Sequence, residues 1–172
     1  MKSINAIIGT VSAAILLSGF FGLTLANAQD VRNTAEYNLD NGVGLKGFQE
    51  KAAFGFDPVS IFRDGGGVPL EGQQALNLDY QGVRYFFANT PNREAFIQSP
   101  NKYEPTYGGW CAYAMASGQK IHVEAKYFSI HGNRAHYFVS NRAKQNFDRD
   151  VAGHEGRADG FWKQISGEDP RL

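Results

Sequence analysis

The chain has 172 residues, with 17 basic and 17 acidic residues and a single cysteine. This length suits one domain that buries a real core. The balanced charge gives no bulk attraction to nucleic acid or to an anionic membrane, so we expect neither as a partner. The lone cysteine excludes an internal disulfide.

The first 28 residues predict a secretory signal peptide, which would place the mature protein outside the cytoplasm. Lys2 precedes an uncharged apolar stretch from Ala6 to Ala26, and Ala26-Asn27-Ala28 has the small-x-small pattern of a signal peptidase site. Cleavage there would make Gln29 the first mature residue. The alternative is an uncleaved anchor, because the apolar stretch approaches the ~20 residues that span a bilayer.

Residues 29–53 are polar and rich in Gly and Asn, which predicts an N-terminal arm or loop rather than a regular element. The domain itself is expected over residues 54–172. Its pattern of strands and helices predicts the α+β class. We expect a small single domain in which two β-hairpins form an antiparallel sheet that packs against several short helices.

The first hairpin is predicted where apolar and polar residues alternate. Leu76–Tyr80 and Val83–Phe87 show this alternation, and Gln81-Gly82 separates them as a turn.

A helix is predicted to follow over residues 89–99. Thr90 is expected to cap it, and Pro91 suits the first helical position because its missing N–H would have no helical partner there. Phe96 and Ile97 are expected to face the core, and Pro100 to end the helix.

A second hairpin is predicted over Tyr127–Ser140, with Gly132-Asn133 as its two-residue turn. With that turn His131 pairs with Arg134, and every further pair follows in register. The register assigns one face of the hairpin to the core. The residues expected on that face are Phe128, Ile130, Ala135, Tyr137 and Val139.

His131 and His136 fall on the same face in this register, as diagonal neighbours about 7–8 Å apart. That spacing is long for two ligands of one metal ion, and no His-x-x-His or His-Glu-x-x-His motif occurs. We therefore expect both side chains to be exposed to solvent. The sequence also has no nucleophile elbow, phosphate loop or dinucleotide fingerprint.

The end of the chain is predicted to be helical. Ala143, Phe147 and Val151 recur at helical spacing up to an expected stop at Gly153. A final amphipathic helix is then expected to bury Ala158, Phe161, Trp162 and Ile165.

The most distinctive segment runs from Tyr103 to Ala116 and contains Cys111. Gly108 and Gly109 allow a sharp turn or a close backbone approach, and the Ala-rich run after them favours a helix that ends at Gly118. Cys111 is therefore expected near a helix start, where free N–H groups stabilise a thiolate.

Met115 lies four residues after Cys111, so its thioether is expected on the same helix face. Two sulfur ligands suit Cu(I) or another soft metal ion, and His122 could add a further ligand. The alternative is that both sulfur residues belong to the core, because unpaired cysteine is among the most buried residue types. The sequence leaves both interpretations open.

Four segments carry a resemblance to a known family. They are Gly55–Phe62, Tyr80–Phe87, Phe96 with Pro100–Pro105, and Tyr107–Ala114. In order and spacing they resemble the exported branch of the YHS-domain family. The resemblance implies a small α+β domain in the periplasm of a Gram-negative bacterium. It also implies the heavy-metal associations of the wider family, whose short members accompany copper and other metal transporters.

The chain departs from the metal-linked short YHS domains at their other cysteines. Those domains resemble Asp-Pro-Val-Cys at the first motif and carry a cysteine after the aromatic strand, where this sequence has Ser60 and Ala88-Asn89. The chain also has His122–Tyr127 where similar proteins have Asp-Pro-x-x-Trp. In the exported branch the shared cysteine matches Cys111, and some relatives are labelled as selenoproteins, which points to redox chemistry.

The remaining motif residues suit an architectural role. Asp57 followed by Pro58 fixes a turn, because Asp binds nearby N–H groups while Pro restricts its neighbour to extended angles. We predict structural rather than catalytic roles for Asp57, Pro58, Tyr103, Tyr107, Gly108 and Gly109. Trp110 and Tyr113 are further aromatic members of the motif, expected to surround the cysteine together with Tyr107.

Three functions follow from these patterns. The first is a periplasmic domain that binds a small ligand, copper or another soft metal through Cys111, Met115 and His122. The second is a redox protein whose Cys111 is oxidised and then reduced by an external thiol, since no second cysteine is present. The third is an interaction module without chemistry. None of the three requires a membrane once the signal peptide is removed.

Overall fold

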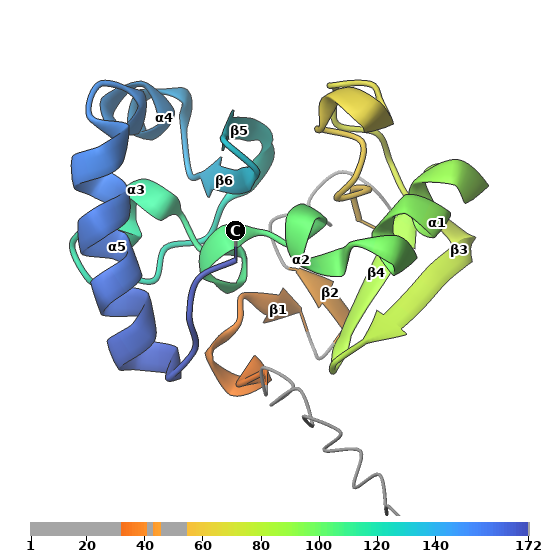
Figure 1. The fold of residues 1–172 in the computed structure, drawn as a ribbon, viewed down its shortest axis with the longest axis horizontal. Helices are drawn as coiled ribbons and strands as arrows, with labels where there is room; N and C mark the ends of the chain where they lie inside the picture. The colour runs from red at the N-terminus through yellow and green to blue at the C-terminus, as the bar shows by residue number, and fades with distance from the viewer. Residues whose placement is uncertain (1–31, 41–42, 46–54, 172) are drawn as a thin grey trace, which may run out of the picture.

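The computed structural model describes residues 32–40, 43–45 and 55–171 (Figure 1). The predicted signal peptide and much of the predicted arm lie outside these residues. The described part is an α+β fold, as the sequence predicted. Its helices are α1 (Thr90–Gln98), α2 (Pro100–Tyr103), α3 (Ala112–Met115), α4 (Asn141–Asp148) and α5 (Val151–Ser166), with short 3-10 turns η1 (Thr34–Glu36), η3 (Arg63–Gly65) and η4 (Thr106–Gly109).

Both predicted hairpins form with the predicted turns. Strands β3 (Gln73–Tyr80) and β4 (Val83–Phe87) meet at the Gln81-Gly82 turn. Strands β5 (Glu124–His131) and β6 (Arg134–Phe138) pair in the predicted register from His131 opposite Arg134 to Phe128 opposite Tyr137. Beyond this point the register shifts, so Phe138 lies opposite Glu124.

The two hairpins are separate two-stranded sheets and are not hydrogen-bonded to each other. The outer edge of β6 is already occupied, because Pro105 forms an isolated parallel bridge with Ala135 and Cys111 forms one with Tyr137. Segment 105–111 therefore takes the place where a further strand would pair. Figure 1 shows α2 between the β3–β4 hairpin and the β5–β6 hairpin.

Part of the predicted N-terminal arm forms regular elements. The turn η1 precedes a small antiparallel pair, β1 (Leu39–Asp40) and β2 (Val43–Leu45). Tyr37 anchors this region, because its ring lies 5.7 Å from that of Trp162 and is buried. Burial of an aromatic ring stabilises a segment whose polar composition alone predicted no structure.

Helix α1 differs from the prediction in two details. Asn89, rather than Thr90, is the N-cap, because its side-chain oxygen accepts a hydrogen bond from the N–H of Asn92 at 2.9 Å. Phe96 is fully buried, but Ile97 is 47% exposed. Neighbouring helical residues point about 100° apart, so they do not share one buried face.

The C-terminal helices divide at Arg149-Asp150 and not at Gly153. The side chain of Asp150 caps α5 by accepting a hydrogen bond from the N–H of Gly153 at 3.1 Å. Because α5 begins at its cap Asp150, the preceding helix α4 ends before Gly153 is reached. Ala158 and Trp162 face the core as predicted, whereas Phe161 is exposed.

A single cluster of buried hydrophobic residues joins the hairpins, the helices and Tyr37, which follows η1. Strand β6 is buried on both faces: Ala135 and Tyr137 lie on the predicted core face, and Phe138 lies on the opposite face against Phe147 of α4. Val139, which the pattern placed in the core, is 38% exposed just after the strand ends. Helix α4 on one side and segment 105–115 on the other explain this double burial.

Candidate functional site

The backbone before Cys111 turns through three successive left-handed residues, Tyr107, Gly108 and Gly109, with φ values of 61°, 58° and 83°. A Cβ atom at Gly108 would lie 2.7 Å from the ring of Trp162, so only glycine fits there. The carbonyl of Gly108 accepts a hydrogen bond from the N–H of Asn38 at 3.0 Å. The turn is therefore held by packing against Trp162 and by the backbone hydrogen bond from Asn38.

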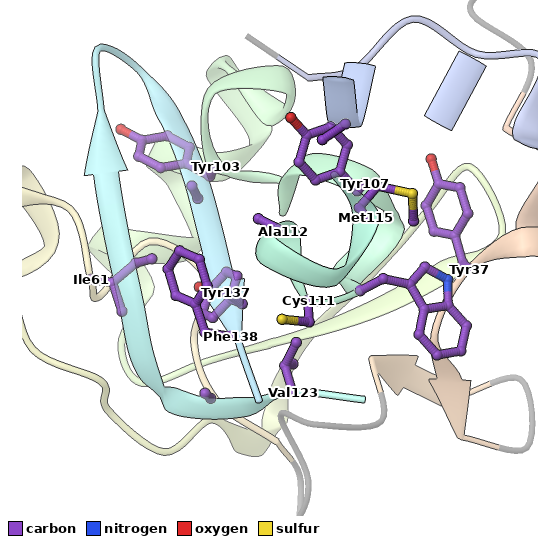
Figure 2. Packing of buried hydrophobic residues seen from close by; sticks show 14 of the residues in the cluster. Tyr37, Ile61, Tyr103, Tyr107, Cys111, Ala112, Met115, Val123, Tyr137 and Phe138 are labelled. Carbon is purple, nitrogen blue, oxygen red and sulfur yellow. The ribbon is translucent and has the colours of Figure 1, made fainter. Parts of the chain in front are cut away.

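Cys111 lies at the N-cap position of α3, so the predicted helix start is confirmed. Its N–H donates to the carbonyl of Ile121 at 3.0 Å, and its side chain is completely buried. Figure 2 shows the thiol pointing toward Val123, Tyr137 and Phe138. Helix α3 has four residues, which is little more than one turn and a small dipole.

The three residues proposed as soft-metal ligands do not come together. Met115 is also fully buried, but Figure 2 shows its sulfur pointing in a different direction from the thiol of Cys111, toward the side of Tyr37. His122 is exposed, and its Nδ1 lies 2.6 Å from Oδ1 of Asn38. Within residues 32–40, 43–45 and 55–171, no three His, Cys, Asp or Glu side chains are placed to hold a metal ion.

Asp57 is a buried acceptor where three segments meet. Its carboxylate accepts hydrogen bonds from the N–H of Val59 at 2.8 Å, the N–H of Ala88 at 2.9 Å and the amide of Asn92 at 2.6 Å. Burial raises the pKa of Asp57, while these donors oppose the shift. Pro58 beside it is also buried. The carboxylate thus joins the turn after Gly55 to the end of β4 and the start of α1.

The aromatic motif residues each have a defined contact. Trp110 Nε1 donates to the carbonyl of Glu36 at 2.7 Å, and Tyr107 Oη donates to Asp159 at 2.7 Å. The ring of Tyr113 lies 5.2 Å from that of His154. These contacts hold the segment around Cys111 against η1 and α5. The architectural roles of these residues stay a prediction for mutagenesis.

His136 belongs to a buried cluster that the sequence did not identify. It was expected to be exposed, but it is fully buried, because α4 covers this face of the hairpin and its ring lies 4.9 Å from Phe147. Its Nε2 lies 2.7 Å from Oε1 of Glu155, and its Nδ1 has no hydrogen-bond partner among the described residues. Its neighbour His131 is half-buried, 6.0 Å away between ring centroids. Burial lowers the pKa of His136, and the carboxylate of Glu155 opposes this.

A buried polar network joins the C-terminal tail to the interior. Glu104 accepts a hydrogen bond from Tyr85 Oη at 2.8 Å and is ion-paired with Arg171 at 3.3 Å. Arg171 also contacts Glu168 at 2.7 Å, and Glu168 accepts a hydrogen bond from Tyr37 Oη at 2.8 Å. Every member has a partner inside the network, so the buried charges are paired and the network fixes the C-terminal tail to the interior.

A pocket of about 540 Å³ opens where η3, α2 and the β5–β6 turn meet. The three segments are far apart in sequence, so no local motif could predict this pocket. Its lining residues are Phe62, Arg63, Asp64, Lys102, Ile130, Gly132 and Asn133.

The wall of the pocket is fixed by a compact polar group. Asp64 Oδ2 accepts hydrogen bonds from Lys102 Nζ and Tyr103 Oη, both at 2.6 Å. Burial favours the neutral form of Asp64, but the hydrogen bonds from Lys102 and Tyr103 prevail and hold its pKa below the usual value. Phe62 packs against Tyr103 of this group, with 5.1 Å between the centroids of the two rings.

Gly65 sets the path of the loop that carries Arg63 and Asp64. A Cβ atom at Gly65 would lie 2.1 Å from the carbonyl oxygen of Val59, so the close approach of these two backbone segments requires glycine. The loop therefore packs against the backbone at Val59, whose N–H donates to Asp57. At this point the Asp57 motif contacts the loop that lines the pocket.

Comparisons of the chain with models of protein families, with curated proteins and with solved structures gave no match. The YHS-like resemblance of the sequence therefore stays a prediction. In the part of the chain that the structure describes, no helix has the length and apolar character needed to cross a membrane.

Proposed function

We propose that this chain is an exported, YHS-like binding module that holds a small organic molecule in the pocket between η3, α2 and the β5–β6 turn. The observation that carries the proposal is the pocket itself. Its volume, about 540 Å³, lies within the range of roughly 300–1,000 Å³ typical of sites for small molecules. Three segments distant in sequence contribute to its lining.

The chemistry of the lining supports binding. Ile130 and Phe62 supply apolar surface, while Arg63, Asp64 and Lys102 supply charge. A site with an apolar surface and a few fixed polar groups can orient a ligand without reacting with it. The hydrogen bonds among Asp64, Lys102 and Tyr103 hold the polar wall in place before a ligand arrives.

The geometry gives less support to functions that use Cys111. A redox thiol has to meet its oxidant and its reductant, and a soft-metal site needs converging ligands. The thiol is fully buried, the sulfur of Met115 points in a different direction, and His122 is exposed with its ring beside Asn38. We therefore favour the binding hypothesis with the ligand site moved from the cysteine to the pocket.

The proposal is tested by a fragment screen on the purified, isotope-labelled protein. A set of acidic, neutral and basic aromatic fragments is added, and backbone amide shifts are followed by NMR. We expect the binding fragments to shift the amides of Gly65, Gly132 and Asn133 in a saturable way. Fragments that bind only at other amides, or no saturable shift at these three, would contradict the proposal.

Export is tested separately by the intact mass of the protein recovered from the host in which it is made. The Ala26-Asn27-Ala28 pattern predicts a mature chain that begins at Gln29. A mass that includes the first 28 residues would contradict cleavage and favour an uncleaved anchor.

A further inference from the structure

We infer that the ligand of the pocket is a small organic anion with an apolar body, and that Arg63 selects it. This inference rests on the proposed function, because it names the ligand class of the same pocket. It follows from which charges of the lining are already compensated and which one is not.

The charges of Asp64 and Lys102 compensate each other. Their side chains form an ion pair at 2.6 Å, and Tyr103 Oη donates to the same carboxylate oxygen. Lys102 Nζ also lies 4.7 Å from the centroid of the Tyr103 ring, which further fixes the ammonium group. Neither charge is left as the main attraction for a ligand.

Arg63 is the uncompensated charge of the lining. Its side chain is exposed, and its guanidinium has no hydrogen-bond or ion-pair partner among the described residues. The described lining therefore has a net charge of one positive unit, given by Arg63 and Lys102 against Asp64. This excess favours an anion over a cation.

The shape of a guanidinium specifies the anion further. Arginine offers paired N–H donors in a plane, which match the two oxygens of a carboxylate better than a single hydroxyl or amide. Ile130 and Phe62 lie on the same pocket and offer contact to an apolar body. An aromatic or branched aliphatic carboxylate would satisfy both parts, whereas a bare anion would use only Arg63.

The experiment compares four matched probes on the purified protein by NMR titration: benzoate, benzamide, benzylamine and acetate. We expect benzoate to bind most tightly at the Gly65, Gly132 and Asn133 amides. Replacing Arg63 by Gln should weaken benzoate binding about three- to fivefold, the size expected for one exposed ion pair, and leave benzamide unchanged. Arg142→Gln, an exposed arginine on α4 outside the pocket, is the control and should change neither.

The outcomes separate the inference from the proposed function. Equal binding of benzoate and benzamide, or tighter binding of benzylamine, at these amides would overturn the selection of anions while leaving a binding pocket. Benzoate binding that Arg63→Gln leaves unchanged would overturn the role of Arg63. Acetate binding as tightly as benzoate would overturn the need for an apolar body. Absence of saturable shifts with all four probes would overturn both the inference and the proposed function.

Discussion

The segment around Cys111 and the pocket beside Arg63 differ in how distinctive their sequence is and in how far they are buried. The first has the most unusual composition in the chain, yet Cys111, Met115 and Tyr107 are fully buried in the core. The second has no recognisable local motif, yet it gathers charged and apolar groups at a pocket open to solvent. In this chain the most distinctive sequence segment packs into the core. The accessible charged and apolar groups of the pocket come from segments that meet only after folding.

Asp57→Ala is expected to have the largest effect, and it tests the structural role of the buried motif residues. The substitution leaves three donors, on Val59, Ala88 and Asn92, without their buried acceptor. We expect a loss of about 3–5 kcal/mol in the free energy of unfolding, measured by denaturant titration. Asp57→Asn, which keeps one acceptor oxygen, should cost less. Unchanged stability combined with loss of ligand binding would contradict the architectural role.

Gly108→Ala tests the left-handed turn before Cys111. An added Cβ would be strained at a φ of 58° and would lie 2.7 Å from Trp162. We expect destabilisation of about 2–4 kcal/mol from backbone strain and overpacking together. The matched control is Gly156→Ala on the open side of α5, where nothing lies within 4 Å; it should stabilise the helix by up to about 1 kcal/mol. Similar effects at both positions would show that the turn is not constrained.

The pH dependence of stability tests the burial of His136. Burial lowers its pKa below the unfolded value of about 6.5, so the unfolded chain takes up a proton first as the pH falls. The contribution of His136 is therefore fully present above pH ~6.5 and declines below it, by at most about 1.4 kcal/mol per pH unit. His136→Gln should flatten this decline, while His122→Gln at an exposed site should not. An unchanged slope in His136→Gln would contradict the assignment.

Carboxylates add a second loss of stability at lower pH. The hydrogen bond from His136 and the nearby Arg134 lower the pKa of Glu155. Its contribution is present above the unfolded pKa and is lost as the pH falls through the lower folded value. The two effects share a direction but occupy successive pH ranges, and they are coupled because His136 and Glu155 are hydrogen-bonded to each other. Glu155→Gln should remove the loss at lower pH, whereas His136→Gln should remove the loss below pH ~6.5 and also reduce the lower one, as measured by stability against pH.

The hairpins and the helix start at Cys111 were predictable because their signals are local. A two-residue turn fixes the register of its strands, and the pairing of His131 with Arg134 followed from Gly132-Asn133 alone. The same register correctly placed His131 and His136 side by side. It could not show that α4 would cover this face and bury His136 against Phe147.

The candidate site was predicted less well than the fold, for a physical reason. Helical spacing placed Met115 near Cys111, but Cys111 is the N-cap of α3 and has an extended backbone, with φ of −60° and ψ of 116°. Its side chain therefore does not follow the helical spacing, and the two sulfur atoms point in different directions. The pocket depends on the approach of Arg63 and Lys102 to the β5–β6 turn. No periodicity encodes that approach, because it results from packing between elements that are remote in the sequence.

The most direct test of the comparison is the alkylation rate of Cys111 in the native protein. Because the thiol is fully buried, we expect iodoacetamide to react only through opening of the fold, at least about a thousandfold more slowly than with the denatured protein. The logarithm of the rate should rise in Asp57→Ala and Gly108→Ala in proportion to their loss of stability. Native labelling within about tenfold of the denatured rate, or protection of the thiol by added Cu(I), would contradict the account and return the function to the cysteine.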